Sequence, residues 1–171
     1  WRDHVNLVNG HEIVSLLIDG RATLVVTAHY GNFEVGGYMM GLLGFPTYTV
    51  ARTLDNPFLD EYLNDFRSCC GQRIIPKQGA FDYTADVLGS GHAMAFLADQ
   101  YAGVKGCWVE FFGRQASAHK AIALLALEND ATVVISGNRR LDNKPLQFEL
   151  KTHASIDPRE SRGDIGTIKL L

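Results

Sequence analysis

A histidine and a glutamate five positions apart, His29 and Glu34, are the residues of this sequence whose types and spacing could do chemistry together. Gly31 and Asn32 lie between them. If Gly31 makes a turn and Asn32 caps a helix that begins at Phe33, Glu34 lies in the first helical turn and can face back toward His29. Its carboxylate could then accept the imidazole Nδ1 proton, which leaves Nε2 as a base toward a substrate hydroxyl.

The spacing alone does not settle this, because a turn histidine and a surface carboxylate that never meet give the same pattern. Placement adds information. Polar residues follow several apolar runs at the point where each run ends: His29, Arg52, Asp99 with Gln100, and Ser136 with Arg139 and Arg140. In a parallel sheet the carboxyl ends of the strands share one edge, and ligands bind in the crevice outside it. The sequence therefore predicts a site at that edge.

The elements that must position these residues alternate between strands and helices. Strands are expected at 23–28, 47–51, 72–75, 93–98, 108–112, 132–136 and 146–152, and helices at 5–18, 33–43, 57–70, 80–88 and 118–129. Several of the strand runs do not alternate in polarity, which indicates strands buried on both faces. The predicted fold is α/β, with a mixed, largely parallel central sheet flanked by helices.

Composition limits the class of protein. The chain has 171 residues, 46% of them hydrophobic, which suits one domain over 1–171. A net charge of −3 leaves no general basic surface for nucleic acid. The cysteines and the other histidines lack metal-ligand spacing, so no metal is expected. No apolar run approaches the roughly 20 residues of a spanning helix. Because the chain opens at Trp1, we expect an excerpt lacking an N-terminal membrane anchor and the C-terminal end.

Four sequence blocks, in order, carry a resemblance to a known family. They are HYGNFE at 29–34, VARTLDNPFLD at 50–60, LADQ at 97–100 and VEFFG at 109–113. Together they resemble the lipid A biosynthesis lauroyl/myristoyl acyltransferase family, within the wider glycerophospholipid-acyltransferase superfamily. The similarity runs in order over roughly residues 10 to 140. It implies a glycerophospholipid-acyltransferase-like fold.

The resemblance also implies the reaction. A fatty acyl group would pass from an acyl thioester, carried by acyl carrier protein or coenzyme A, to a hydroxyl of a lipid acceptor such as a lipid A precursor. No metal or other cofactor takes part in such a reaction. The implied place is the cytoplasmic face of the bacterial inner membrane, with peripheral or anchored association, in lipopolysaccharide biosynthesis. A lipid esterase or thioesterase, or a lipid-binding module without turnover, is the alternative.

Residue roles follow from the same resemblance. His29 matches the general base and Glu34 the carboxylate that orients it. Arg52 matches an arginine near the reacting carbonyl or a lipid phosphate, and Phe112 with Gly113 matches the wall of an acceptor pocket.

Further residues are candidates for contact with the substrate. Backbone N–H groups at Gly31 and Asn32 are candidate donors to the oxyanion. Asp99 and Gln100 either bind substrate or hydrogen-bond the loop ends. Asn56 is placed among the substrate-binding residues and is also suited to capping a helix that starts at Pro57.

Three positions depart from the family pattern. Phe33 stands where the family usually has Trp, Thr53 where Pro commonly follows the arginine, and Ser117 where Thr is common. These changes bear on the substrate more than on the reaction.

Overall fold

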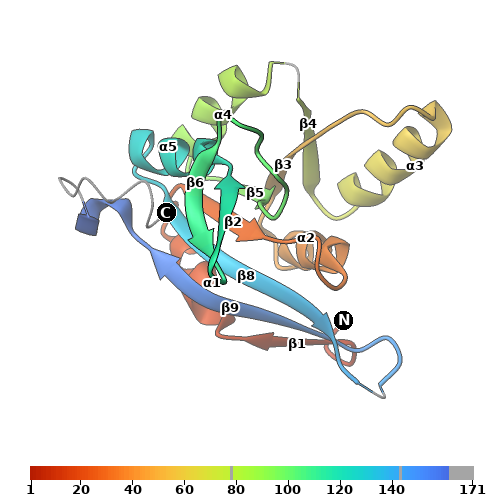
Figure 1. Cartoon of the computed structure of the whole chain (residues 1–171). Coiled ribbons are helices and arrows are strands. Elements are labelled where there is room, and N and C mark those ends of the chain that lie inside the picture. Colours follow the sequence, from red (N-terminus) through yellow and green to blue (C-terminus); the bar gives the residue numbers. More distant parts are fainter. Residues whose placement is uncertain (78, 143, 162–171) are drawn as a thin grey trace.

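The computed structural model describes residues 1–77, 79–142 and 144–161 (Figure 1). The elements in chain order are β1 (Val5–Val8), α1 (Gly10–Ile18), β2 (Thr23–Thr27), α2 (Phe33–Leu42), β3 (Thr47–Ala51), α3 (Pro57–Ser68), β4 (Gln72–Pro76), α4 (Ala80–Gly89), β5 (Ala93–Leu97), β6 (Cys107–Phe111), β7 (Arg114–Ala118), α5 (Lys120–Glu128), β8 (Thr132–Arg140), β9 (Phe148–Ile156) and a short 3-10 helix, Pro158–Ser161.

The described strands form one large sheet and a separate hairpin. The large sheet has seven strands in the order β1-β9-β8-β2-β5-β3-β4, and β6 pairs only with β7. All neighbours in the large sheet are parallel except β8 and β9, which are antiparallel. This confirms the predicted α/β class with a mixed, largely parallel sheet.

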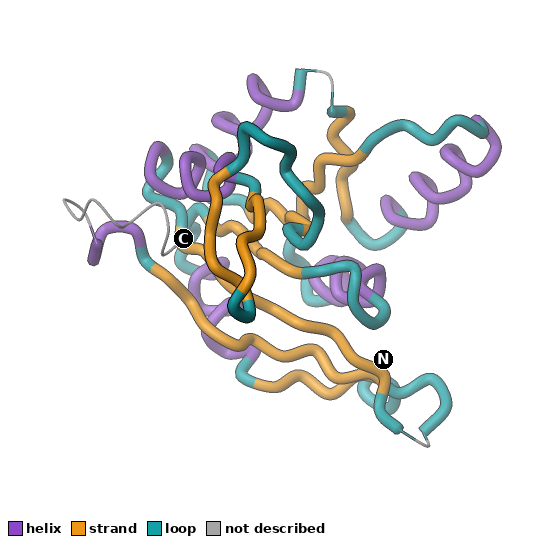
Figure 2. Tube along the Cα trace, viewed as in Figure 1, coloured by secondary structure: helices purple, strands orange, loops and turns teal. Residues whose placement is uncertain are grey.

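Helices cover both faces of the sheet (Figure 2). Successive residues of a strand point to opposite faces, so the apolar side chains on each face need a covering layer. Leu24, Met94 and Val133 pack in one core with Leu88 of α4 and the apolar face of α5. The next residue on β2, Val25, packs on the other face with Ile13 of α1. A strand that is buried on both faces has a continuous run of apolar residues, which is why polar and apolar residues do not alternate along these strands.

α3 differs from the other helices. It stands at the β4 end of the sheet (Figure 1), and none of its residues is buried. Asn56 caps its N-terminus: the side-chain oxygen accepts hydrogen bonds from the backbone N–H groups of Phe58 and Leu59, at 3.0 and 3.3 Å. Pro57 occupies the first turn. The predicted cap is confirmed.

Two predicted elements were wrong in type or extent. The helix expected over 5–18 is a strand, β1, followed by the shorter α1, because residues 5–8 extend along β9 at the sheet edge. The helix expected from 118 begins at Lys120, since residues 114–118 form β7 and pair with β6. Both segments take their conformation from a partner strand that is distant in the chain or joined through a tight turn.

Candidate active site

His29 lies just beyond β2 at the predicted edge of the sheet, and its partner comes from β5. The two strands are parallel neighbours, with Thr27 opposite Leu97. Two residues further along each strand direction stand His29 and Asp99. The imidazole Nδ1 lies 2.8 Å from Asp99 Oδ1, and the His29 backbone N–H donates to Asp99 Oδ2 at 2.9 Å. Strand register therefore brings these two residues together.

Asp99 holds the ring and the backbone of His29 at once. An ionised carboxylate can only accept hydrogen bonds, so this contact favours the tautomer with the proton on Nδ1 and the lone pair on Nε2. Partial burial works against the charge, but the hydrogen bonds from the His29 ring and backbone outweigh it, so the pKa of Asp99 is held below its ordinary value. The His29 side chain is 41% exposed, which leaves the ring accessible to a substrate.

Glu34 has a different partner from the predicted one. Its two oxygens accept from the guanidinium of Arg67 on α3: Oε2 lies 3.1 Å from Nε, and Oε1 pairs with Nη2. Both side chains are mostly shielded, 21% exposed for Arg67 and 26% for Glu34. The hydrogen bond to Glu34 is the main cause that raises the pKa of Arg67.

The predicted pairing of His29 with Glu34 through Nδ1 is therefore wrong. Glu34 does lie in the first turn of α2, as expected. The Nδ1 position, however, is taken by Asp99, and the paired guanidinium donors of Arg67 match both oxygens of Glu34. A role for Glu34 in catalysis or substrate binding stays a prediction.

The turn between His29 and α2 requires a glycine. Gly31 has φ +64°, and a Cβ there would lie 2.1 Å from the backbone oxygen of Asn138 on β8. Asn32 occupies the N-cap position, as predicted, but its side chain makes no capping hydrogen bond. The first-turn N–H groups of α2 thus have no side-chain acceptor, and these are the groups that suit a developing negative charge.

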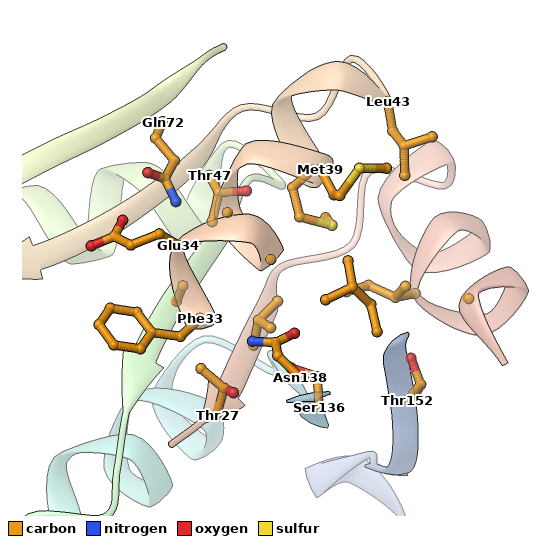
Figure 3. A pocket seen from close by; sticks show the side chains of 18 of the residues that line it. Thr27, Phe33, Glu34, Met39, Leu43, Thr47, Gln72, Ser136, Asn138 and Thr152 are labelled. Atoms are coloured by element: carbon orange, nitrogen blue, oxygen red, sulfur yellow. The ribbon is translucent and has the colours of Figure 1, made fainter. Parts of the chain in front are cut away.

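A cavity of about 130 Å³ lies between α2 and the face of the sheet (Figure 3). Most of its lining is apolar and comes from α1, α2 and the strands beneath them, including Ile13, Val25, Met39, Met40, Leu43 and Leu150. Glu34, Arg67 and Phe33 also line it. The ring of His29 meets Phe33 edge to face, with centroids 5.3 Å apart. Phe33 therefore both lines the cavity and contacts His29.

Arg52 directly follows β3 and has its own ion-pair partner. It pairs with Asp55, three residues along the chain, and its side chain is 72% exposed. It lines a second pocket between β3, β4 and the helix α3, together with Arg73 and Asp60. The predicted contact of Arg52 with a substrate carbonyl or phosphate stays a prediction.

The other predicted site residues have structural settings of their own. Gln100 follows Asp99 and is exposed. Asn56 uses its side-chain oxygen to cap α3. Phe112 and Gly113 form the two-residue turn of the β6–β7 hairpin, with φ values of +50° and +72° as such turns require, and Phe112 is 91% exposed. Their binding of substrate stays a prediction.

The sequence reading missed Arg67, Gln72 and Asn138, which the structure brings to the cavity. Arg67 falls on the exposed face of an amphipathic helix pattern, where an arginine is ordinary. Gln72 and Asn138 occupy strands whose neighbours are set by the sheet order. No local sequence pattern indicates that these three residues lie at one cavity.

The described ranges hold no candidate metal cluster and no candidate membrane span. Among residues 1–77, 79–142 and 144–161, no group of three or more His, Cys, Asp or Glu side chains is placed to hold a metal ion. Across the same ranges, every helix is too short or too polar to traverse a bilayer.

Comparison with known proteins gives the family of this chain. It belongs to the bacterial lipid A biosynthesis acyltransferase family, whose model matches residues 2–169. It is also similar to a phosphatidylinositol mannoside acyltransferase of Mycolicibacterium smegmatis, with 24% identity over 135 residues. That match covers 77% of this chain and 44% of the relative, so the chain spans less than half of the relative's length.

Proposed function

We propose that this chain transfers a fatty acyl group from an acyl thioester to a hydroxyl of a glycolipid, with His29 as the general base. The observation that carries the proposal is the contact of His29 with Asp99. It leaves an accessible imidazole whose Nδ1 is held by a carboxylate, at the carboxyl edge of a parallel sheet in a chain of an acyltransferase family.

The proposed chemistry is a direct displacement. Nε2 of His29 takes the proton of the acceptor hydroxyl as its oxygen attacks the thioester carbonyl carbon. The C–S bond then breaks, and the thiolate takes up the proton from the imidazolium. Asp99 keeps the ring oriented and offsets the positive charge that forms on it. The uncapped N–H groups at the start of α2, beside Gly31 and Asn32, are the proposed donors to the oxyanion.

The cavity beneath α2 is the proposed place for the fatty chain. Its apolar lining suits a hydrocarbon, and Phe33 connects it to His29. The pair of Glu34 and Arg67 lines this cavity and ties α2 to α3. We propose that the pair fixes the position of α2 over the fatty chain.

Donor and acceptor are proposed at the level of class. The donor is a thioester of acyl carrier protein or coenzyme A. The acceptor is a lipid A precursor or a related glycolipid. The proposed place is the cytoplasmic face of the bacterial inner membrane.

Exposed aromatic side chains on α3 support contact with a lipid surface. Phe58, Tyr62 and Phe66 recur at helical spacing and are 80%, 68% and 43% exposed, and Leu59 adjoins them. Aromatic rings on one side of an amphipathic helix suit the boundary between headgroups and hydrocarbon. Because α3 also carries Arg67, a helix lying at that boundary would place the cavity beside the lipid.

The test uses purified protein, a radiolabelled acyl thioester and a glycolipid acceptor, with free thiol and labelled lipid measured in parallel. We expect the acylated glycolipid and the thiol to form in equal amounts. Release of thiol and fatty acid without labelled glycolipid would show a thioesterase instead. Binding of the thioester without either product would show a lipid-binding module.

A further inference from the structure

Two adjacent cysteines, Cys69 and Cys70, stand at the end of α3, where the chain turns into β4. Their sulfur atoms lie 3.7 Å apart, and both are free thiols. Cys69 is exposed and Cys70 is half-buried. A cysteine that only fills space is usually buried, whereas an exposed thiol in contact with a second thiol is placed to react with small molecules.

The second thiol lies in the contact between α3 and α2. A Cβ at Gly41 of α2 would lie 1.4 Å from the backbone oxygen of Cys70 and 3.2 Å from its Cβ, so the two segments meet here without a gap. Hydrogen bonding to Cys70 is the main cause that raises the pKa of Tyr38 on α2. Tyr38 in turn stacks on Phe66 of α3, with ring centroids 6.0 Å apart. A change at Cys70 therefore acts on the surface that joins the two helices.

The same segment continues into the wall of the cavity beneath α2. Gln72 stands two residues after Cys70, and its side chain lines the cavity (Figure 3). A Cβ at Gly37 would lie 1.3 Å from Nε2 of Gln72, so this side chain also packs closely against α2. Arg67, which pairs with Glu34, stands about one helical turn before Cys70. Along the chain, the thiol pair thus lies between two contacts that α2 makes.

We propose that Cys69 and Cys70 form a modification site that reacts reversibly with small disulfides and, once oxidised, loosens α2 from α3. The thiolate of Cys69 attacks one sulfur of glutathione disulfide, which gives a mixed disulfide and releases one glutathione. Cys70 then attacks the Cys69 sulfur, and the second glutathione leaves. Two protein thiols are oxidised to one disulfide. One glutathione disulfide is reduced to two glutathione molecules, which take up the two protons.

The geometry predicts a bridge that is easily reduced and that disturbs its surroundings. The Cα atoms of adjacent residues lie about 3.8 Å apart, below the usual range for a disulfide, so the bridge would be labile. To form it, the two sulfurs must approach from 3.7 Å to about 2 Å, and the peptide between them must twist. Because Gly41 lies directly against the Cys70 carbonyl, we expect this twist to displace α2.

Two features set the conditions of the experiment. The hydrogen bond to Cys70 is the main cause that holds the pKa of Cys69 above its ordinary value, so its thiolate is scarce at neutral pH. The exchange is therefore run at mildly alkaline pH with long incubation. The exposed aromatic side chains of α3 that we propose to lie on lipid share the helix that ends at Cys69. Protein free of lipid is therefore used, so that glutathione disulfide reaches the thiol.

The chemistry is tested by treating the wild-type chain, Cys69→Ser, Cys70→Ser and Cys107→Ser with a mixture of glutathione and glutathione disulfide. Cys107→Ser is the matched control, because Cys107 is a free cysteine on β6. Peptide masses report the products. We expect the wild type and the control to lose two hydrogen atoms in the peptide that holds both cysteines, and a reducing thiol to restore them.

The two serine variants separate the steps. Cys70→Ser should stop at a mixed disulfide on Cys69, because the resolving thiol is gone. Cys69→Ser should react at least about tenfold more slowly than the wild type, because the remaining thiol is half-buried. The absence of a bridge in the wild type would overturn the proposal. So would a mixed disulfide on Cys69 that persists in the wild type as it does in Cys70→Ser.

Hydrogen exchange measures the effect on α2 without any catalysis. We expect the backbone amides of α2 to exchange about five- to tenfold faster in the bridged wild type than in the reduced one. The amides of α5, which packs on the opposite face of the sheet from α1, should exchange equally in both. Equal exchange of α2 in the bridged and reduced proteins would overturn the coupling of the thiol pair to this helix.

Turnover connects the site to the proposed acyl transfer, on which this last step rests. We expect the bridged wild type to lose kcat/KM for transfer by about tenfold and to regain it on reduction, because a small displacement of positioning elements is costly to the rate. Cys69→Ser should keep its activity under the same treatment. Unchanged transfer by the bridged protein would overturn the link to the cavity. A chain that forms the bridge and loosens α2 but transfers no acyl group would refute the proposed function and support the modification site.

Discussion

Two carboxylates near the start of α2 form similar contacts by different means. Asp99 meets His29 because β5 and β2 run parallel in register, so residues at equal distance past each strand end adjoin. Glu34 meets Arg67 because α2 and α3 pack side by side. The first pair is two-fifths exposed and carries a titratable base, whereas the second is three-quarters shielded and carries a guanidinium that keeps its proton. We propose that the first pair is reactive and that the second holds α2 against α3.

Removal of the base should have the largest effect. We expect His29→Ala to reduce kcat for acyl transfer by about a hundredfold to ten-thousandfold, the range for loss of a general base. The melting temperature should change little, since the His29 side chain is 41% exposed and fills no core. A folded His29→Ala protein with turnover near the wild-type value would refute the assignment of the base.

The next largest effect should come from Asp99. Asp99→Asn keeps the size of the side chain but removes the charge that offsets the imidazolium, so we expect kcat to fall by about a hundredfold with KM little changed. The measurement is steady-state transfer over a range of acceptor concentrations. A rise in KM at constant kcat would make Asp99 a substrate ligand, which is the other interpretation of this residue.

Glu34→Gln tests the other half of the comparison. If the pair with Arg67 fastens α2 to α3, the variant should lose about 1–2 kcal/mol of unfolding free energy, as for a partly shielded ion pair, and should retain kcat within about threefold. Chemical denaturation and turnover would be measured on the same sample. A loss in kcat as large as that of Asp99→Asn, with stability intact, would restore Glu34 as a catalytic residue.

Arg52 should show a smaller and more selective effect. Lysine keeps the charge but loses the paired hydrogen bonds of a guanidinium, so Arg52→Lys should raise KM for a phosphorylated acceptor by about three- to tenfold. With an acceptor that lacks phosphate the kinetics should match the wild type. An equal loss of kcat with both acceptors would indicate that Arg52 acts at the thioester carbonyl.

The smallest expected effect is on the pH dependence of folding stability in the acid range. Because the pKa of folded Asp99 lies below its ordinary value, the pair stabilises the fold above the ordinary aspartate pKa of about 4 and stops doing so as the pH falls through the lower folded pKa. Asp99→Asn should therefore lose less stability than the wild type between neutral pH and that acid range. Urea unfolding at several pH values measures the difference. If the unfolding free energies of the wild type and Asp99→Asn had the same dependence on pH, the contact would be contradicted.

The fold class could be predicted from the sequence because buried parallel strands have continuous apolar sequences, as at 23–27, 93–97 and 132–135. The edge that bears His29 was readable for the same reason, since it is where those runs end. β1 and β7 were not predicted, because their pairing with β9 and β6 decides their conformation.

The partner of His29 was not readable in the same way. Spacing along the chain favoured Glu34, five residues away, over Asp99, seventy residues away. Register between β2 and β5 made the distant residue the neighbour. Arg67 could have been paired with Glu34 only with knowledge of how α3 packs on α2, which depends on contacts that no local pattern encodes.

The tautomer of the His29 ring is the property that tests the central claim most directly. Nitrogen NMR of the labelled histidine side chains, with the His29 signals assigned by their loss in His29→Ala, reports which ring nitrogen carries the proton. The account predicts a protonated Nδ1 at neutral pH in the wild type, retained in Glu34→Gln and lost or mixed with the other tautomer in Asp99→Asn. Retention in Asp99→Asn together with loss in Glu34→Gln would contradict it.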